Sequence, residues 1–183
     1  MPRIAPIETA HADPGVKATL SAVKTKIGMV PNLFSTFARS PAALNGYLAF
    51  SDALGKGVLT AKQREIVALA IGQANECEYC LSAHTLMGKG AGLSPEGIRR
   101  AREGKAETAI DAVIASFARR VLEKRGQVTD AEVAAVRSAG LDDARIIEVI
   151  ANVAINVLTN YTNNVALTDI DFPKVDVALR PAA

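Results

Sequence analysis

Helix-start signals recur along this chain, and they constrain its fold more than any other feature of the sequence. Two segments open with a capping box, at Thr60 and at Thr129, where the threonine is followed three residues later by Gln or Glu. Two others open with Ser-Pro, at Ser40 and Ser94, where serine suits the N-cap and proline the first helical position. Apolar residues at helical spacing follow these signals, and no stretch alternates apolar and polar residues as a strand would. The sequence therefore predicts an all-α fold.

Caps and apolar periodicity together predict roughly eight helices. The expected helical ranges are 15–27, 32–38, 41–54, 60–74, a cysteine-bearing helix from a cap at Asn75 to Gly88 or Gly90, 94–104, 107–124, 129–140 and a long segment from a cap at Asp142 to Leu158. Residues 1–13 are expected to form an extended arm, because Pro2, Pro6 and Pro14 disfavour helix there. Residues 14–183 are expected to form a single helical domain.

A faint repeat leaves the organisation of this domain open between two interpretations. Glu65 precedes Cys77 by twelve residues, and Glu148 precedes Asn160 by the same interval. The first interpretation is two unrelated amphipathic helices. The second is a duplicated helical hairpin in which only the first copy keeps reactive residues.

Composition narrows the class of protein. The chain has 183 residues, 49% of them hydrophobic and 22% charged, with a formal net charge of +2. The basic residues are scattered, so no nucleic-acid partner is expected. The N-terminus has no apolar segment of signal-peptide length, and Glu148, Asn152 and Asn156 interrupt the apolar stretch 146–158, so no membrane partner is expected. We expect a cytoplasmic protein.

The only two cysteines form a Cys-x-x-Cys-x-x-x-His motif with one of the two histidines, as Cys77, Cys80 and His84. Steps of three and four residues place the side chains on one face of a helix, which brings a nucleophile, a second thiol and a base together. In a reducing compartment such a pair is more often catalytic or metal-binding than structural. Glu65, on the preceding helix, is a candidate to orient the imidazole; the alternative is an ordinary carboxylate at the rim of an amphipathic helix.

Other chemistries fit the motif less well. Zinc usually takes four ligands and the motif supplies three, with no second cluster in the chain, so no metal is expected. Covalent haem attachment needs a histidine directly after the second cysteine, and that residue is Leu81, so no cofactor is expected. Two buried, unreactive thiols remain an alternative.

The motif resembles a known family. Glu65, eleven intervening residues and then Cys77-x-x-Cys80-x-x-x-His84 resemble the alkylhydroperoxidase AhpD-like proteins of the carboxymuconolactone decarboxylase-like superfamily, in the peroxidase-related branch. The segments 29–34, 40–44, 160–166 and 170–173 are also similar to that branch, so the likeness covers about residues 25 to 175. The resemblance implies an all-α fold, trimers or hexamers, and reduction of hydroperoxides with an external dithiol or protein reductant.

The resemblance also implies roles for the motif residues. Cys80 would meet the peroxide, Cys77 would resolve the oxidised form as a Cys77–Cys80 disulfide, and Glu65 and His84 would relay protons. The helix dipole alone favours Cys77, which lies nearer the helix N-terminus, whereas the His84 contact and the family pattern favour Cys80. The well-studied branch carries a second histidine where this chain has Tyr79, which is no base near neutral pH. A thiol–disulfide oxidoreductase or a redox-sensing oligomer without peroxidase activity is therefore the alternative.

Overall fold

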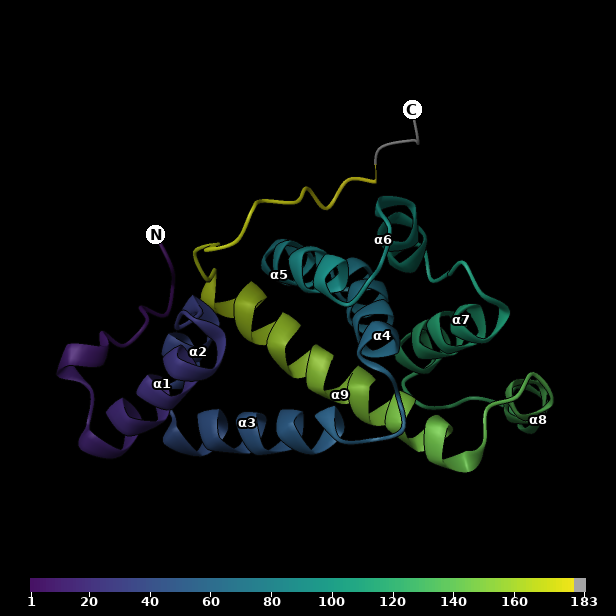
Figure 1. Cartoon of the computed structure of the whole chain (residues 1–183), viewed down its shortest axis with the longest axis horizontal. Coiled ribbons are helices and arrows are strands. Elements are labelled where there is room, and N and C mark those ends of the chain that lie inside the picture. The colour runs from purple at the N-terminus through teal and green to yellow at the C-terminus, as the bar shows by residue number, and fades with distance from the viewer. Residues whose placement is uncertain (180–183) are drawn as a thin grey trace.

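The computed structural model describes residues 1–179, and within that range it is helical, without strands (Figure 1). The nine α-helices are α1 (Pro14–Ile27), α2 (Asn32–Phe37), α3 (Pro41–Gly55), α4 (Ala61–Ala74), α5 (Glu78–Gly90), α6 (Pro95–Arg102), α7 (Ala109–Glu123), α8 (Asp130–Ser138) and α9 (Asp143–Ala166), and a 3-10 turn spans Thr9–His11. The prediction of an all-α fold is confirmed, and each of the nine helical ranges expected from the sequence corresponds to one of these helices.

The helix-start signals act as the sequence predicted. Both capping boxes are formed, at Thr60 before α4 and at Thr129 before α8. Ser40 and Ser94 each accept a hydrogen bond from the backbone N–H three residues later, at the starts of α3 and α6. These bonds satisfy N–H groups that have no partner inside the helix, so local sequence alone sets these boundaries.

The start of α5 differs from the prediction. Asn75 is the C-cap of α4 rather than the N-cap of the next helix, and Cys77 takes the N-cap position of α5. Between them, Glu76 adopts a left-handed φ of 51°. The N–H of Cys77 donates to the Gly72 carbonyl at 2.9 Å and that of Glu76 donates to Gln73 at 3.1 Å. This is a Schellman ending, which reverses the chain within two residues and connects α4 tightly to α5.

The duplicated hairpin is not found in the described residues. Glu148 and Asn160 lie on one uninterrupted helix, α9, whereas Glu65 and Cys77 lie on either side of the α4–α5 turn. The Glu148 carboxylate accepts hydrogen bonds from the backbone N–H groups of Val58 and Leu59, at 2.7 and 2.9 Å. The Glu148 side chain therefore holds the loop before α4, and of the two interpretations left open by the sequence, the duplicated hairpin is wrong.

Helix α4 is the centre of the molecule. It packs against α5, α6, α7 and α9, and residues 66–72 are all buried (Figure 1). Two apolar clusters lie along α4, one shared with α7 and α9 and the other with α5 and α6. A third cluster joins α1, α2 and α3 to the start of α5, and it contains Cys77 and Cys80. The cysteines therefore lie in an apolar part of the core.

The N-terminal segment and the described part of the C-terminal segment, up to residue 179, are both held against the helices. In the arm formed by residues 1–13, the Ile7 N–H donates to the Ser35 carbonyl at 2.9 Å. In the C-terminal segment, the Val175 N–H donates to Ser82 Oγ at 3.0 Å, and Arg102 donates to the carbonyl of Val177 at 3.0 Å. Residues 180–183, which end the predicted domain, lie outside the described range. None of the helices within residues 1–179 combines the length and the apolar character that a membrane-spanning helix needs.

Candidate active site

Cys77 and Cys80 form a disulfide, and their Cα atoms are 5.2 Å apart. Cys77 has no solvent exposure and Cys80 has 3%. The backbone N–H of Cys80 donates to Cys77 Sγ at 3.2 Å, so the sulfur occupies the place of an N-cap oxygen. A thiolate on Cys77 would therefore receive a backbone hydrogen bond at the positive end of α5.

His84 and Glu65 face each other across the α4–α5 hairpin. The distance from His84 Nδ1 to Glu65 Oε2 is 2.8 Å, and the two side chains are only 19% and 17% exposed. A carboxylate can only accept, so Nδ1 carries the proton and Nε2 is left free to accept one. The structure thus brings together the two residues that the sequence proposed as a pair, and Glu65 is not a rim carboxylate.

A cavity of about 340 Å³ lies in front of Cys80 and His84. Most of its wall is apolar: Ile27, Met29, Pro31, Leu33, Phe34, Ala83, Leu86, Met87 and Phe172 line it. The polar or titratable groups that reach it are Tyr47, Tyr79, His84, Thr159 and Asn163. Cys77 and Glu65 do not line it. The two cysteines therefore differ in access, because only Cys80 meets the space that a small molecule could fill.

A smaller, polar cavity of about 100 Å³ lies on the other side of His84. It is lined by Glu65 and by Arg64, Ser51, Asn152 and Asn156, among others. His84, Tyr47 and Thr159 line both cavities, so they form the partition between the apolar space and the polar one. A cavity of this size has room for water beside the carboxylate.

Tyr47, on α3, is a residue of this partition that the sequence did not single out. Burial raises the pKa of its phenol to about 12, an effect that the nearby Glu65 carboxylate reinforces and a hydrogen bond with Ser51 opposes. Tyr47 therefore stays protonated at neutral pH and can act as a hydrogen-bond donor, but not as a base.

Tyr79 has structural contacts. Its hydroxyl accepts a hydrogen bond from the Leu33 N–H at 3.2 Å, and its ring meets the edge of Phe172 with centroids 5.6 Å apart. Burial, reinforced by the neighbouring Asp171 carboxylate, raises the pKa of the phenol well above its usual value. Tyr79 thus fastens α5 to α2 and to the C-terminal segment, and it carries no base to the site.

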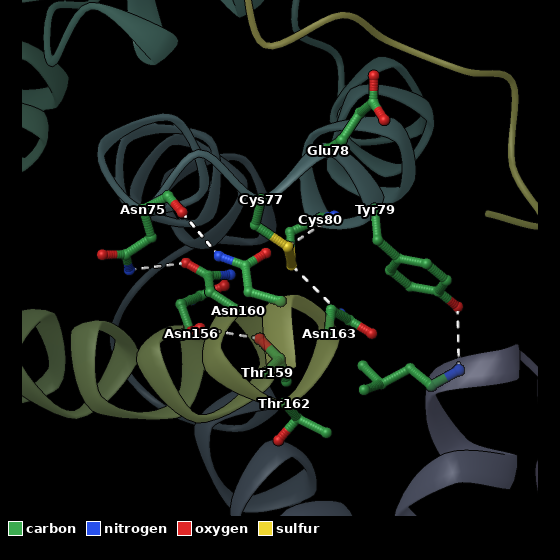
Figure 2. The surroundings of a disulfide bond; sticks show 12 residues. Asn75, Cys77, Glu78, Tyr79, Cys80, Asn156, Thr159, Asn160, Thr162 and Asn163 are labelled. Carbon is green, nitrogen blue, oxygen red and sulfur yellow. Dashed lines mark hydrogen bonds between the residues drawn. A yellow bond between two sulfur atoms is a disulfide. The ribbon is translucent and has the colours of Figure 1, made fainter. Parts of the chain in front are cut away.

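Asn163 is a second residue that sequence reasoning missed. Its side-chain amide donates to Cys80 Sγ at 3.4 Å, from α9, as the dashed line to the sulfur in Figure 2 shows. Asn156, Thr159, Asn160 and Asn163 lie together beneath the disulfide in this view. The sequence did contain a feature that could have indicated Asn163. Asparagines stand at positions 152, 156, 160 and 163, and this spacing places their polar groups on one buried helix face.

Among residues 1–179, no three His, Cys, Asp or Glu side chains are grouped so that they could hold a metal ion. The chemistry that the arrangement offers is that of a thiol pair, an imidazole oriented by a carboxylate and an apolar cavity.

Two sequence comparisons found similarity to this chain. The family model of the Carboxymuconolactone decarboxylase family matches residues 41–124, from α3 through α7, and so includes both cysteines, His84 and Glu65. An uncharacterized protein of Haemophilus influenzae is 47% identical over 45 residues, a match that spans 24% of this chain and 40% of that protein.

Solved structures agree over nearly the whole chain. An uncharacterized peroxidase-related protein from Ralstonia eutropha JMP134, described as an alkylhydroperoxidase AhpD core, is 27% identical with a TM-score of 0.84, covering 93% of this chain and 92% of that one. A peroxidase-related protein from Silicibacter sp. TM1040 is 22% identical with a TM-score of 0.77, covering 91% of each chain. The debrominase Bmp8 is 16% identical with a TM-score of 0.74, covering 92% of this chain and 91% of that one. The last two likenesses concern the fold alone.

Proposed function

We propose a function for this chain on two grounds: it belongs to the AhpD-like carboxymuconolactone decarboxylase superfamily, and a single cysteine of its pair lines an apolar cavity beside a histidine–glutamate pair. The proposed function is that of a thiol-dependent peroxidase, which reduces alkyl hydroperoxides to alcohols. Cys80 is the attacking thiol, Cys77 the resolving thiol, and His84 with Glu65 the proton relay. The observation that carries the proposal is the difference in access between Cys80 and Cys77.

The first step consumes the hydroperoxide. His84 takes the thiol proton at Nε2, and the Cys80 thiolate attacks the terminal oxygen of R–O–O–H. A sulfur–oxygen bond forms and the oxygen–oxygen bond breaks, so Cys80 becomes a sulfenic acid and an alkoxide leaves. The proton held by His84 converts the alkoxide to the alcohol. The Glu65 carboxylate, 2.8 Å from Nδ1, stabilises the imidazolium while it holds that proton.

The second step forms the disulfide. Cys77 attacks the Cys80 sulfur, a sulfur–sulfur bond forms, and the hydroxyl leaves with the Cys77 proton as water. The 5.2 Å between the two Cα atoms lies within the range for such a bond, so resolution requires no large movement of α5.

The third step needs an external dithiol, which supplies two electrons and two protons and is itself oxidised to a disulfide. Its thiolate attacks Cys80 from the cavity side, a mixed disulfide forms and Cys77 leaves as a thiolate. The second thiol of the donor then attacks its own sulfur in the mixed disulfide, which releases Cys80 and closes the disulfide of the donor. The N–H of Cys80, 3.2 Å from Cys77 Sγ, stabilises that leaving thiolate. A leaving group of lower pKa departs faster. The N-cap position of Cys77 therefore favours attack of the dithiol on Cys80, with Cys77 as the leaving thiolate.

The cavity wall supports an organic substrate. The volume of about 340 Å³ falls in the range of small-molecule sites, and the wall is mainly aliphatic and aromatic. An alkyl or aryl group gains about 25 cal/mol for each Å² of apolar surface that it buries there, a gain that hydrogen peroxide lacks. We therefore expect a higher kcat/KM for cumene hydroperoxide than for hydrogen peroxide.

The test is a stopped-flow reaction of the reduced protein with cumene hydroperoxide, read by the loss of thiols, followed by steady-state turnover with dithiothreitol. The parent should lose two thiols per equivalent of peroxide, and Cys80→Ser should lose none. If the reduced parent leaves the peroxide unconsumed, the peroxidase proposal fails.

The second candidate is a thiol–disulfide oxidoreductase, and the N-cap position of Cys77 favours it, because that position stabilises a thiolate. The two candidates separate in one comparison. A peroxidase consumes cumene hydroperoxide, whereas an oxidoreductase without peroxidase activity reduces a model disulfide and leaves the hydroperoxide intact. A redox-sensing oligomer would turn over neither compound.

We also propose that the chain assembles with copies of itself, as a trimer or hexamer, in the cytoplasm. In α9, residues such as Ile146 and Val149 face the core, but the outward side is also apolar. Ile147, Leu158, Tyr161 and Val165 are exposed large side chains on this side. Their spacing places them on one stripe of the helix, and an exposed apolar stripe of this kind is typical of an interface.

A further inference from the structure

Four asparagines form a buried row on the inward face of α9, and burying an amide is costly unless it finds a partner. Asn152, Asn156, Asn160 and Asn163 follow one another at steps of four, four and three, and each is at most 6% exposed. Asn152 and Asn156 donate to the backbone carbonyl one turn earlier, at 2.7 and 2.8 Å. Asn160 accepts from Asn75 Nδ2 at 2.9 Å. Asn152, Asn156 and Asn160 therefore each have a partner within the protein scaffold, although Asn160 Nδ2 has none among residues 1–179.

Asn163 has a different partner, the sulfur of Cys80. Its amide nitrogen donates to Sγ at 3.4 Å, while its Oδ1 is buried with no partner among residues 1–179. A disulfide sulfur is a weak acceptor. In the oxidised protein this hydrogen bond therefore offsets little of the free energy that burying the amide costs. When the disulfide is reduced, the same sulfur position holds a thiol or thiolate, and a thiolate accepts a much stronger, charge-assisted hydrogen bond.

The surroundings of Cys80 hold few other groups that could stabilise a negative charge. The titratable side chains at the cavity are His84 and Tyr79 from α5 and Tyr47 from α3. Behind these stand two carboxylates, Glu65 beside His84 and Asp171 beside Tyr79. No lysine or arginine in the described range lines the cavity. Because burial disfavours a thiolate, hydrogen-bond donors aimed at the sulfur have to offset that cost.

We propose that Asn163 is a catalytic residue, whose side-chain amide hydrogen-bonds the reduced sulfur of Cys80 and stabilises it as the thiolate that attacks the peroxide. Asn163 lines the same cavity as Cys80 and His84, and its amide contacts the sulfur from α9. The assignment of a catalytic role rests on the proposed function, since it takes Cys80 as the attacking thiol. The stabilisation of the thiolate does not depend on peroxide.

The test measures the pKa of one thiol at a time, without peroxide. In Cys77→Ser the only thiol is Cys80, and its pKa is read from thiolate absorbance at 240 nm or from the pH dependence of alkylation. Asn163→Leu removes the donor at similar volume, and Asn163→Asp keeps the shape but replaces the donor with an acceptor. A hydrogen bond to a charged group contributes enough that we expect Asn163→Leu to raise the thiol pKa by about 1–2 units, and Asn163→Asp to raise it further.

Two controls separate a direct contact from a general disturbance of the fold. In Cys80→Ser, where Cys77 is the only thiol, Asn163→Leu should leave the thiol pKa unchanged. In Cys77→Ser, Asn156→Leu alters a buried asparagine of the same helix whose amide bonds only a backbone carbonyl, and it should leave the Cys80 pKa unchanged.

The outcomes are distinct. A rise confined to Cys80 in both Asn163 variants supports the proposal, even if the parent turns out to reduce no peroxide. A Cys80 pKa in both variants within about 0.3 units of the parent, far less than the loss of a charged hydrogen bond predicts, would overturn it. An equal rise for Cys77 and Cys80 would also overturn it, because that pattern indicates a change in the surroundings rather than one hydrogen bond.

Discussion

The pairing of Glu65 with His84 allows a quantitative test of the proton relay. Glu65→Gln removes a negative charge 2.8 Å from His84 Nδ1 and keeps the size of the side chain. A hydrogen bond to a charged group contributes about 1.5–3 kcal/mol, against about 0.5–1.5 kcal/mol for a neutral one. The imidazolium that forms during proton transfer should therefore lose about 1–1.5 kcal/mol of stabilisation. That loss corresponds to a rate of peroxide reduction about 5–13-fold lower at pH 7.

His84→Gln should have a larger effect, because it removes the base itself. Loss of a general base typically costs about 10²–10⁴-fold in rate. The double variant, Glu65→Gln with His84→Gln, tests whether the two residues act as a unit. If Glu65 acts only by orienting and charging His84, then Glu65→Gln should cost nothing further once His84 is gone, and the two effects should not multiply.

The assay is single-turnover stopped flow with reduced protein and excess cumene hydroperoxide, read by thiol loss. Glu123→Gln is the matched control, since it neutralises a half-exposed carboxylate on α7 that pairs with Arg119, away from the cysteines. It should leave the rate unchanged. Parent-like rates in both Glu65→Gln and His84→Gln would refute the relay. Multiplying effects in the double variant would refute the claim that Glu65 acts through His84.

Three further predictions concern the thiols, a phenol and the assembly. With peroxide and dimedone, Cys77→Ser should trap a sulfenic acid on Cys80, observed by mass spectrometry of the peptide; labelling of Cys77 in Cys80→Ser, with none in Cys77→Ser, would reverse the assignment of the two cysteines. The pKa of Tyr47 is raised in the folded protein from 10.0 to about 12, so the unfolded state ionises first and stability is lost as the pH rises through that window. Between pH 10 and 12, measured by urea unfolding, Tyr47→Phe should therefore lose about 1–2 kcal/mol less than the parent, and equal losses would count against the burial of the phenol. Light scattering at micromolar concentration should give a mass well above the 19.2 kDa of one chain, and Tyr161→Glu should lower it; a monomeric parent would contradict the proposed interface.

Much of this fold could be predicted because its signals are local. A capping box such as that at Thr60 involves four consecutive residues, so it needs nothing from the rest of the chain. The same holds for the reactive motif, since a step of four residues brings Cys80 and His84 to one side of α5, and Cys77 lies at the N-cap directly before it. The all-α fold and the composition of the motif were therefore determined by the sequence alone.

Other features depended on how the helices pack. The sequence suggests Asn75 as the N-cap of the next helix, but in the structure Asn75 is the C-cap of α4. The left-handed backbone of Glu76 then places the N-cap of α5 at Cys77. From the sequence, Tyr79 could be described only as a position without the histidine of the resembling family. Its contacts with Leu33 and Phe172 show that it holds α5 in place.

Only the tertiary structure decided which cysteine meets the cavity and which distant side chains reach it. Glu65 lies 19 residues from His84, and Asn163 lies 83 residues from Cys80. Helical periodicity in a sequence tells which face of a helix is buried, but not which residue of which other helix it will meet. That choice depends on the crossing of α4, α5 and α9, which is set by the packing of many apolar side chains at once.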